Sequence, residues 1–470
     1  MDYSGGSIKA DHLCVVVHGV SIRYPLTASR SAKLHGVTKI RDRSLTAIAC
    51  AQLWGNPNHM KTVAKTLRDA YTDDELYILL AKRNSGSSTY DGIERGGERV
   101  CEEIQEEIKK IKANGGNITK LSVVGYSLGG LVSRYAVGLL HAKGILDELR
   151  PMNFTTFASP HLGVRSPLRG WHNHVWNVLG ARTLSMSGRQ LFTIDNFRDT
   201  GKPLLSVMAD PDSIFMEALA RFKRKTLYAN IAHDRSVPYY TACMARTDPY
   251  RDLERVKFNY VPGYEEVVLD PINPVRPSLK PDGVTLESLT NKGLWYLKNA
   301  PKITLITVLV PIAIIGFLIN SVIQNSRSSK RIKLYESGLA GIEPGKYRVP
   351  IMMQELRQRV EGAYEDINNS QHQEYLASSD DENDRELNER DRKTLARERR
   401  MSHPQWPTLA LAPYQFDMIN QLDSLGWHKY PVYLRKNHHT HAAIIVRMEK
   451  PSFVEGYTVM KHWIKEEFLM

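Results

Sequence analysis

The residue types best suited to chemistry stand in one stretch, Leu121 to Tyr135. Ser127 lies there between Gly125 and Gly129, in the pattern G-x-S-x-G. An apolar run precedes the pattern, and apolar residues at helical spacing follow it, which predicts a strand, a tight turn and a helix. Such a turn exposes the serine hydroxyl as a nucleophile, and the helix start directs N–H groups toward an anion formed there. The alternative interpretation is an ordinary turn between a strand and a helix.

An acid and a base for this serine are predicted from the order of residues along the chain. Asp234 follows the apolar stretch 226–232, where a carboxylate can orient an imidazole and stabilise its charged form. The histidine should come later in the chain. In folds that carry the serine on such a strand–turn–helix, the order along the sequence is serine, acid, histidine. We predict His441, which precedes the apolar run 442–447, interpreted as a strand; His439 is the second choice. A solvated turn aspartate is the alternative for Asp234.

Donors for a developing oxyanion are also predicted. The backbone N–H of Leu128 follows the nucleophile, and the apolar strand before it in the chain ends in His18-Gly19. A His-Gly pair at a strand end opens the loop that completes the oxyanion hole in lipases and esterases. The second donor is then Val20 as the sequence stands, or Leu53 if the segment between them is absent.

Several of these motifs together resemble the fungal lipid-droplet phospholipases within the family of putative serine esterases. The resemblance rests on the sequences LWGNPNHM, TYDGI and ASPHLGV, the D-x-x-V-P that begins at Asp234, and the H-x-x-I-I-V-R that begins at His441. It implies an α/β-hydrolase with a mostly parallel central sheet flanked by helices. It also implies a carboxylic ester hydrolase, a phospholipase or lipase, that cleaves glycerophospholipid acyl esters through an acyl-enzyme. His161 comes too early in the chain for the base, so we interpret it as a pocket or loop residue.

Residues 20–52 separate the His-Gly pair from the LWGNP motif, which are continuous in the family that the chain resembles. The segment begins Val-Ser and ends Ala-Gln, as the translation of a retained intron often does. We therefore predict an artefact of the gene sequence; a genuine loop is the alternative, although long structureless loops are uncommon in compact domains.

The only long apolar run covers residues 303–323, and its length is that of a membrane-spanning helix. A single span would place Asp234 and His441 on opposite sides of a membrane. Pro311 and Gly316 allow a bend, so we predict a hairpin that enters one leaflet. A buried helix is the alternative.

The predicted organisation has four parts. Residues 1–300 form the hydrolase core, with a lid or ordinary core packing at 165–222, and 301–325 form the hairpin. Residues 326–404 form a basic and then charged linker, partly disordered. Residues 405–470 return to the core with the catalytic histidine.

The net charge of +12 suits an anionic phospholipid surface, and no nucleic-acid motif accompanies it. The four cysteines have no paired spacing, no signal peptide is expected, and neither a cofactor nor a metal site is expected. The resemblance implies a lipid substrate and the cytosolic face of lipid droplets, with the endoplasmic reticulum membrane as a second location. Two other hypotheses remain. The protein could be a catalytically impaired protein anchored to lipid droplets, or an acyltransferase or thioesterase that uses the same serine, aspartate and histidine. Protein partners are not predicted.

Overall fold

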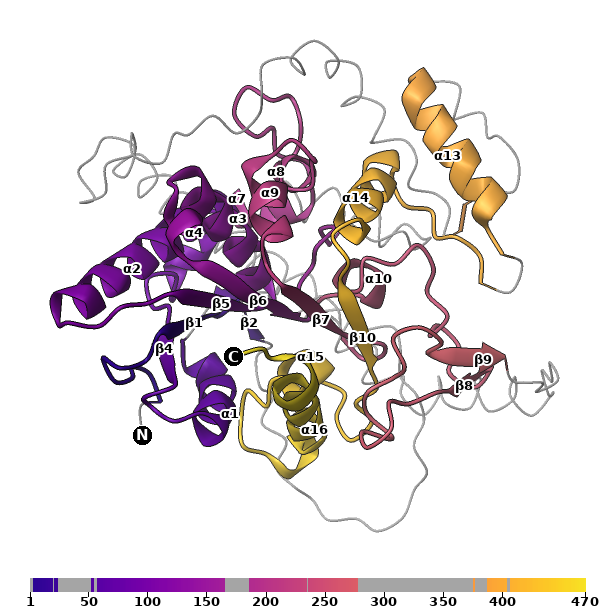
Figure 1. Ribbon diagram of the computed structural model, residues 1–470. Helices are drawn as coiled ribbons and strands as arrows, with labels where there is room; N and C mark the ends of the chain where they lie inside the picture. Colours follow the sequence, from indigo (N-terminus) through magenta and orange to yellow (C-terminus); the bar gives the residue numbers. More distant parts are fainter. Residues whose placement is uncertain are drawn as a thin grey trace, which may run out of the picture.

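The computed structural model describes residues 3–19, 21–23, 52–54, 57–164, 186–234, 236–277, 375–376, 387–403 and 406–470 (Figure 1). The predicted hairpin at 301–325 lies outside the described residues. So do most of the insert at 20–52, most of the linker at 326–404, and residues 165–185 of the predicted lid.

A six-stranded parallel sheet forms the centre, in the order β10-β7-β6-β5-β1-β4. Its strands are β1 (His12–Val17), β4 (Leu76–Leu80), β5 (Lys120–Tyr126), β6 (Arg150–Phe157), β7 (Arg224–Asn230) and β10 (His428–Val432). Two short antiparallel ribbons join β2 (Ser21–Arg23) to β3 (Gln52–Trp54), and β8 (Val256–Phe258) to β9 (Val275–Pro277). The central sheet confirms the predicted fold class.

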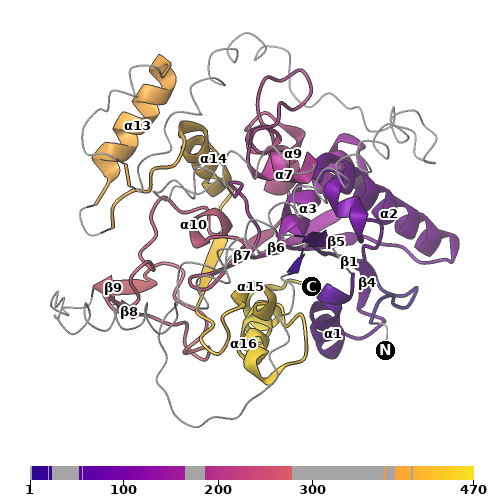
Figure 2. The ribbon, with the colours of Figure 1, turned by 180° about the vertical axis from the view of Figure 1, so that it is seen from behind.

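The central strands are apolar on both faces, because helices cover both sides of the sheet. In β1, Leu13 and Val15 belong to one hydrophobic cluster, and Cys14 and Val16 belong to the other. The first cluster includes residues of α2 (Ile93–Ala113), α3 (Leu128–Ala142), α9 (Ile214–Ala220) and α14 (Pro413–Asp423). The second includes residues of α1 (Lys61–Ala70), α15 (Thr440–Ala443) and α16 (Glu455–His462). Both views show these two groups of helices on opposite faces of the sheet (Figures 1 and 2). The three layers explain why the core strands read as unbroken apolar runs in the sequence.

The helices on the first face include the two longest of the described part of the chain and the short helices that follow residue 185. They are α2 (Ile93–Ala113), α3 (Leu128–Ala142), α4 (Ile145–Glu148), α7 (Met186–Leu191), α8 (Leu204–Val207), α9 (Ile214–Ala220) and α14 (Pro413–Asp423). The described part of 165–222 packs in the core: Leu204, Phe215 and Leu219 are fully buried.

The remaining helices lie on the other face, at the carboxyl edge of the sheet, or outside the layers. They are α1 (Lys61–Ala70), α10 (Tyr239–Ala242), α13 (Glu389–Met401), α15 (Thr440–Ala443) and α16 (Glu455–His462), with the shorter turns η1 (Pro57–Met60), η2 (Ser87–Tyr90), η7 (Pro451–Phe453) and η8 (Trp463–Glu467). The last part of the chain supplies both the edge strand β10 and the helices α15 and α16.

The run 442–447, predicted as a strand, is not one. Residues Thr440–Ala443 form α15, and Val446 then turns the chain in the left-handed region. A short apolar run fits a buried strand and a buried helical turn equally well, so its composition could not decide between them.

Candidate active site

The serine turn joins β5 to α3 at the carboxyl edge of the sheet. Ser127 has φ 55° and ψ −131°, a conformation that non-glycine residues rarely adopt. Its N–H donates to the carbonyl of Phe157, at 2.9 Å, which ties the turn to β6. A Cβ at Gly125 would lie 2.5 Å from Gly130 Cα, and one at Gly129 would lie 2.5 Å from the Val17 carbonyl oxygen. The crowding explains why both flanking positions are glycine.

Asp234 lies in the loop that follows β7, and its side chain is nearly inaccessible. Its Oδ1 accepts from the N–H groups of Ser236 and Val237, at 3.0 and 2.8 Å, and its Oδ2 accepts from Asn230 Nδ2 at 2.9 Å. Three donors fix the carboxylate in one orientation.

His441 lies between these two side chains. Its Nδ1 is 2.9 Å from Asp234 Oδ2, and its Nε2 is 3.0 Å from Ser127 Oγ. A carboxylate accepts only, so Nδ1 carries the proton and Nε2 accepts from the serine hydroxyl. The structure therefore brings the three predicted residues into one hydrogen-bonded line. His439, the second choice, is exposed at the start of α15.

The predicted oxyanion donors are partly described. Leu128 is the first residue of α3, where an N–H has no acceptor within the helix. A Cβ on Gly19 would lie 2.7 Å from Leu128 N and 2.2 Å from the Tyr126 carbonyl oxygen, so the loop after β1 rests directly on the serine turn. Val20 lies outside the described residues. Leu53 belongs to β3, where it pairs with Ile22 of β2.

Two buried histidines near the site are held neutral. Burial lowers the pKa of His18 to about 4, and its Nδ1 is 3.4 Å from the Gly19 carbonyl oxygen. Burial and the nearby Arg134 guanidinium hold the pKa of His161 well below its ordinary value. His161 Nε2 bonds Thr156 Oγ1 at 3.0 Å, not the serine. His161 is thus a buried loop residue, as the sequence indicated.

Backbone strain gathers at the carboxyl ends of three neighbouring strands. Ser127 follows β5, Ala158 follows β6 and His233 lies just beyond β7, and all three have positive φ, at 55°, 45° and 59°. Such conformations cost about 1–3 kcal/mol each and cluster at functional sites. The strained residues and the hydrogen-bonded side chains of Ser127, His441 and Asp234 therefore lie at the same edge of the sheet.

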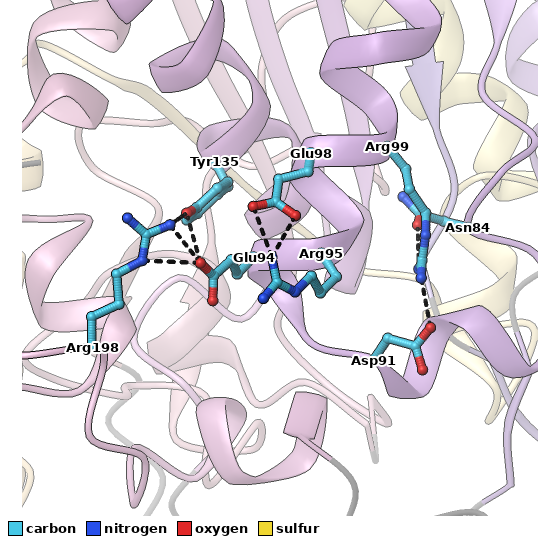
Figure 3. A network of polar contacts seen from close by, with 8 residues as sticks. All are labelled: Asn84, Asp91, Glu94, Arg95, Glu98, Arg99, Tyr135 and Arg198. Carbon is cyan, nitrogen blue, oxygen red and sulfur yellow. Dashed lines mark hydrogen bonds and ion pairs between the residues drawn. The ribbon is translucent and has the colours of Figure 1, made fainter. Parts of the chain in front are cut away.

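The segment 186–198 is fastened to α2 beside the site by contacts that the sequence did not suggest. Ser187 Oγ accepts from Gly92 N at 2.9 Å, and Gln190 Oε1 accepts from Ile93 N at 2.6 Å, so α7 caps the start of α2. Arg198 bonds Glu94 and Tyr135, within the polar network of Figure 3. A short sequence motif cannot predict hydrogen bonds between residues about a hundred positions apart.

The described residues include no group of three or more side chains suited to hold a metal ion. Among the same residues, no helix is long and apolar enough to cross a bilayer.

Residues 48–246 match the family described as "Putative serine esterase (DUF676)". The chain is 30% identical over 185 residues to "Putative lipase C4A8.10" of Schizosaccharomyces pombe, an alignment that covers 38% of this chain and 23% of the relative. It is 32% identical over 181 residues to "Putative lipase ROG1" of Saccharomyces cerevisiae, with 38% and 25% covered. With "Putative lipase YDL109C" of the same yeast the identity is 34% over 143 residues, with 30% and 21% covered.

The chain thus spans about a quarter of the length of these relatives or less. No solved structure matches it. The matched region contains Ser127 and Asp234, whereas β1 and His441 lie outside it. Residues 48–246 are thus similar to the family of putative serine esterases, and the parallel central sheet flanked by helices is that of the α/β-hydrolase fold.

Proposed function

We propose that the chain is a serine hydrolase that cleaves acyl esters of glycerophospholipids. The observation that carries the proposal is the line Ser127 Oγ, His441 Nε2, His441 Nδ1 and Asp234 Oδ2, with separations of 3.0 and 2.9 Å. A nucleophile bonded to a base, and the base oriented by a third group, is the arrangement that activates a hydroxyl for acyl transfer.

The first half of the reaction forms an acyl-enzyme. His441 Nε2 takes the proton of Ser127 Oγ as the oxygen attacks the ester carbonyl carbon. The Leu128 N–H faces the negative charge that develops on the carbonyl oxygen, and such a donor contributes about 10²–10³-fold in rate. The tetrahedral intermediate then collapses, and the departing glycerol oxygen takes the proton from His441. A lysophospholipid leaves, and the acyl group stays on Ser127.

The second half repeats these steps with water. His441 takes a proton from a water molecule, the hydroxide oxygen attacks the acyl carbon, and the proton returns to Ser127 as the fatty acid departs. Asp234 stays ionised throughout and stabilises the imidazolium.

The substrate class and the location rest on different support. The matched relatives are named lipases, and the motifs of the chain resemble lipid-droplet phospholipases. The net charge of +12 and the apolar run at 303–323 fit an anionic lipid surface. We therefore include the cytosolic face of lipid droplets in the proposal, with the 301–325 hairpin as the anchor. Protease protection tests the anchor: cleavage before 300 and after 330 from opposite faces of a vesicle would contradict a hairpin.

The experiment for the activity compares purified wild type with Ser127→Ala on phospholipid vesicles and on triacylglycerol emulsions. We expect wild type to release fatty acid from phospholipid, and Ser127→Ala to lose at least about a thousandfold of that rate. Equal rates in the two proteins would contradict the proposal. Release of fatty acid from triacylglycerol but not from phospholipid would support a serine hydrolase and exclude phospholipid as its substrate.

A further inference from the structure

Tyr126 is the last residue of β5 and immediately precedes the nucleophile. It is fully buried in the hydrophobic cluster that also contains Ala442 and Ala443 of α15. In the pattern G-x-S-x-G it is the first variable residue. Its position places it between the strand that carries Ser127 and the segment that carries His441.

The side chain of Tyr126 contacts the base in two ways. Its hydroxyl donates to the backbone carbonyl oxygen of His441, at 2.9 Å. Its ring lies against the His441 imidazole, with the ring centroids 5.0 Å apart and the planes inclined by 36°. One side chain thus holds both the backbone and the ring of the same histidine.

The Arg447 side chain is a second hydrogen-bond partner of the Tyr126 oxygen. Burial raises the pKa of the Tyr126 phenol, so it remains a protonated donor. The hydroxyl therefore accepts from Arg447 while it donates to His441. A buried hydroxyl with both functions in use has one preferred orientation.

The turn that returns Arg447 is strained. Val446 has φ 48°, and β-branched residues rarely adopt positive φ. The N–H of Val446 donates to the Ala443 carbonyl, and the N–H of Arg447 donates to the Ala442 carbonyl, both at 3.0 Å, which closes α15. This is the hydrogen-bond pattern of a helix end that normally takes glycine at the left-handed position. The neighbouring contacts must stabilise the turn enough to keep valine there.

The other described contacts of His441 and Thr440 tie this segment to residues that follow β7, not to β5. Asp234 fixes His441 Nδ1, and Thr440 Oγ1 donates to the Ala232 carbonyl at 2.8 Å; both partners follow β7. Tyr126 alone among these groups belongs to β5, the strand that immediately precedes Ser127. It therefore sets the position of the base relative to the nucleophile, whereas Asp234 sets it relative to β7.

We propose that Tyr126 is a positioning residue, which anchors the backbone and ring of His441 to the strand of Ser127 and so maintains the contact between Nε2 and Oγ. The inference rests on the proposed function. It adds a residue whose own atoms take no part in the bond changes.

The test is Tyr126→Phe, which keeps the ring and removes the hydroxyl, measured on a short-chain soluble ester. We expect kcat to fall about tenfold to a hundredfold, since a misplacement of about 1 Å can cost about a hundredfold. KM should stay within about twofold, because Tyr126 is buried behind the turn. A kcat within about twofold of wild type in the folded variant would overturn the proposal.

Tyr228→Phe is the matched control. Tyr228 is also fully buried, and its hydroxyl bonds His462 Nδ1 at 2.7 Å, a histidine outside the catalytic line. Loss of that hydroxyl should change the melting temperature to a similar extent and leave kcat unchanged. An equal fall of kcat in both variants would indicate a general effect of stability and contradict a positioning role.

Two further measurements keep the proposal testable if Tyr126→Phe fails to fold or if the ester is not turned over. Arg447→Gln changes a half-exposed residue and should lower kcat in the same direction by a smaller factor. The NMR signal of the His441 Nδ1 proton should exchange faster in Tyr126→Phe, or in Arg447→Gln if Tyr126→Phe does not fold, than in wild type, and this needs no activity. Absent Ser127-dependent turnover in wild type would contradict the function, whereas an unchanged proton signal would contradict the positioning role.

Discussion

At the scale of single residues, the site depends on the orientation of Asp234. Two backbone N–H groups and the amide of Asn230 hold its carboxylate, and its Oδ2 also meets His441 Nδ1. The carboxylate is thus arranged before any substrate binds. In the proposed mechanism, Asp234 holds the imidazole in the tautomer in which Nε2 can take the serine proton.

Asp234→Asn should keep this geometry and remove the activity. An amide nitrogen facing Nδ1 favours the wrong tautomer, and in a serine protease the same change lowers kcat about 10⁴-fold. We expect a fall of similar order on a soluble ester, with a melting temperature close to that of wild type. Asp270→Asn is the control, because Asp270 also accepts two backbone N–H groups, from Ile272 and Asn273, but lies outside the line. Full activity of Asp234→Asn would exclude it as the acid.

At the scale of elements, the site is the meeting point of turns from separate parts of the chain. Strands β5, β7 and β10 are parallel, so the loops that follow them meet at one edge of the sheet. The segment 186–198 is joined to α2 by hydrogen bonds of Ser187 and Gln190. Arg198 adds a contact with Glu94, which Figure 3 shows. These contacts are few and specific, which makes them testable.

Arg198→Ala should loosen the segment after α7. The guanidinium donates to Glu94 Oε1 through Nε and Nη2, at 3.0 and 2.5 Å, and both side chains are largely buried. Both side chains keep part of their surface in water, so removal of the arginine should cost about 1–3 kcal/mol of unfolding free energy. Denaturant unfolding measures the loss, and limited proteolysis should cut near 198. Arg255→Ala removes an exposed pair with Asp252 and should cost less than about 1 kcal/mol; an equal loss would contradict the assignment.

His12 makes the stability of β1 depend on pH. Burial lowers its pKa from 6.5 to about 4, and its Nε2 bonds Ser122 Oγ at 2.7 Å. Between these pH values the unfolded chain binds the proton and the folded chain does not, so acid favours unfolding. The contribution is fully present above about pH 6.5 and falls by about 3 kcal/mol by pH 4.

His12→Gln removes this titration. We expect the unfolding free energy of wild type to decline relative to the variant as the pH is lowered from 7 to 4, in urea titrations at each pH. A constant difference between the two proteins across that range would contradict a neutral, buried His12.

At the scale of the whole molecule, the catalytic line unites residues more than 300 positions apart, and the sequence could supply only part of it. Ser127 lies in a local motif, so its turn could be predicted from a few residues. Asp234 and His441 followed from chain order and from the family resemblance. Tyr126 could not be found in this way, because its bond to His441 spans 315 positions. The helix at His441 was missed because a short apolar run has no period that separates helix from strand.

The insert at 20–52 allows a test on the same scale. Ser21 pairs with Trp54 in the ribbon of β2 and β3, so the two ends of this segment lie side by side. A variant that joins Gly19 directly to Leu53 should therefore fold, and its oxyanion loop should be continuous. We expect its kcat on a soluble ester to exceed that of the full sequence. A folded variant with lower kcat would contradict an artefactual insert.

The most direct test of the central claim is the covalent trapping of Ser127. Purified wild type, Ser127→Ala and Tyr228→Phe are incubated with a fluorophosphonate, and the adduct is located by peptide mass spectrometry. An activated serine should bond the phosphorus and expel fluoride, so we predict one adduct on the peptide containing Ser127 in wild type and Tyr228→Phe, and none in Ser127→Ala. A folded wild-type protein that forms no adduct, or an adduct that persists in Ser127→Ala, would contradict the account.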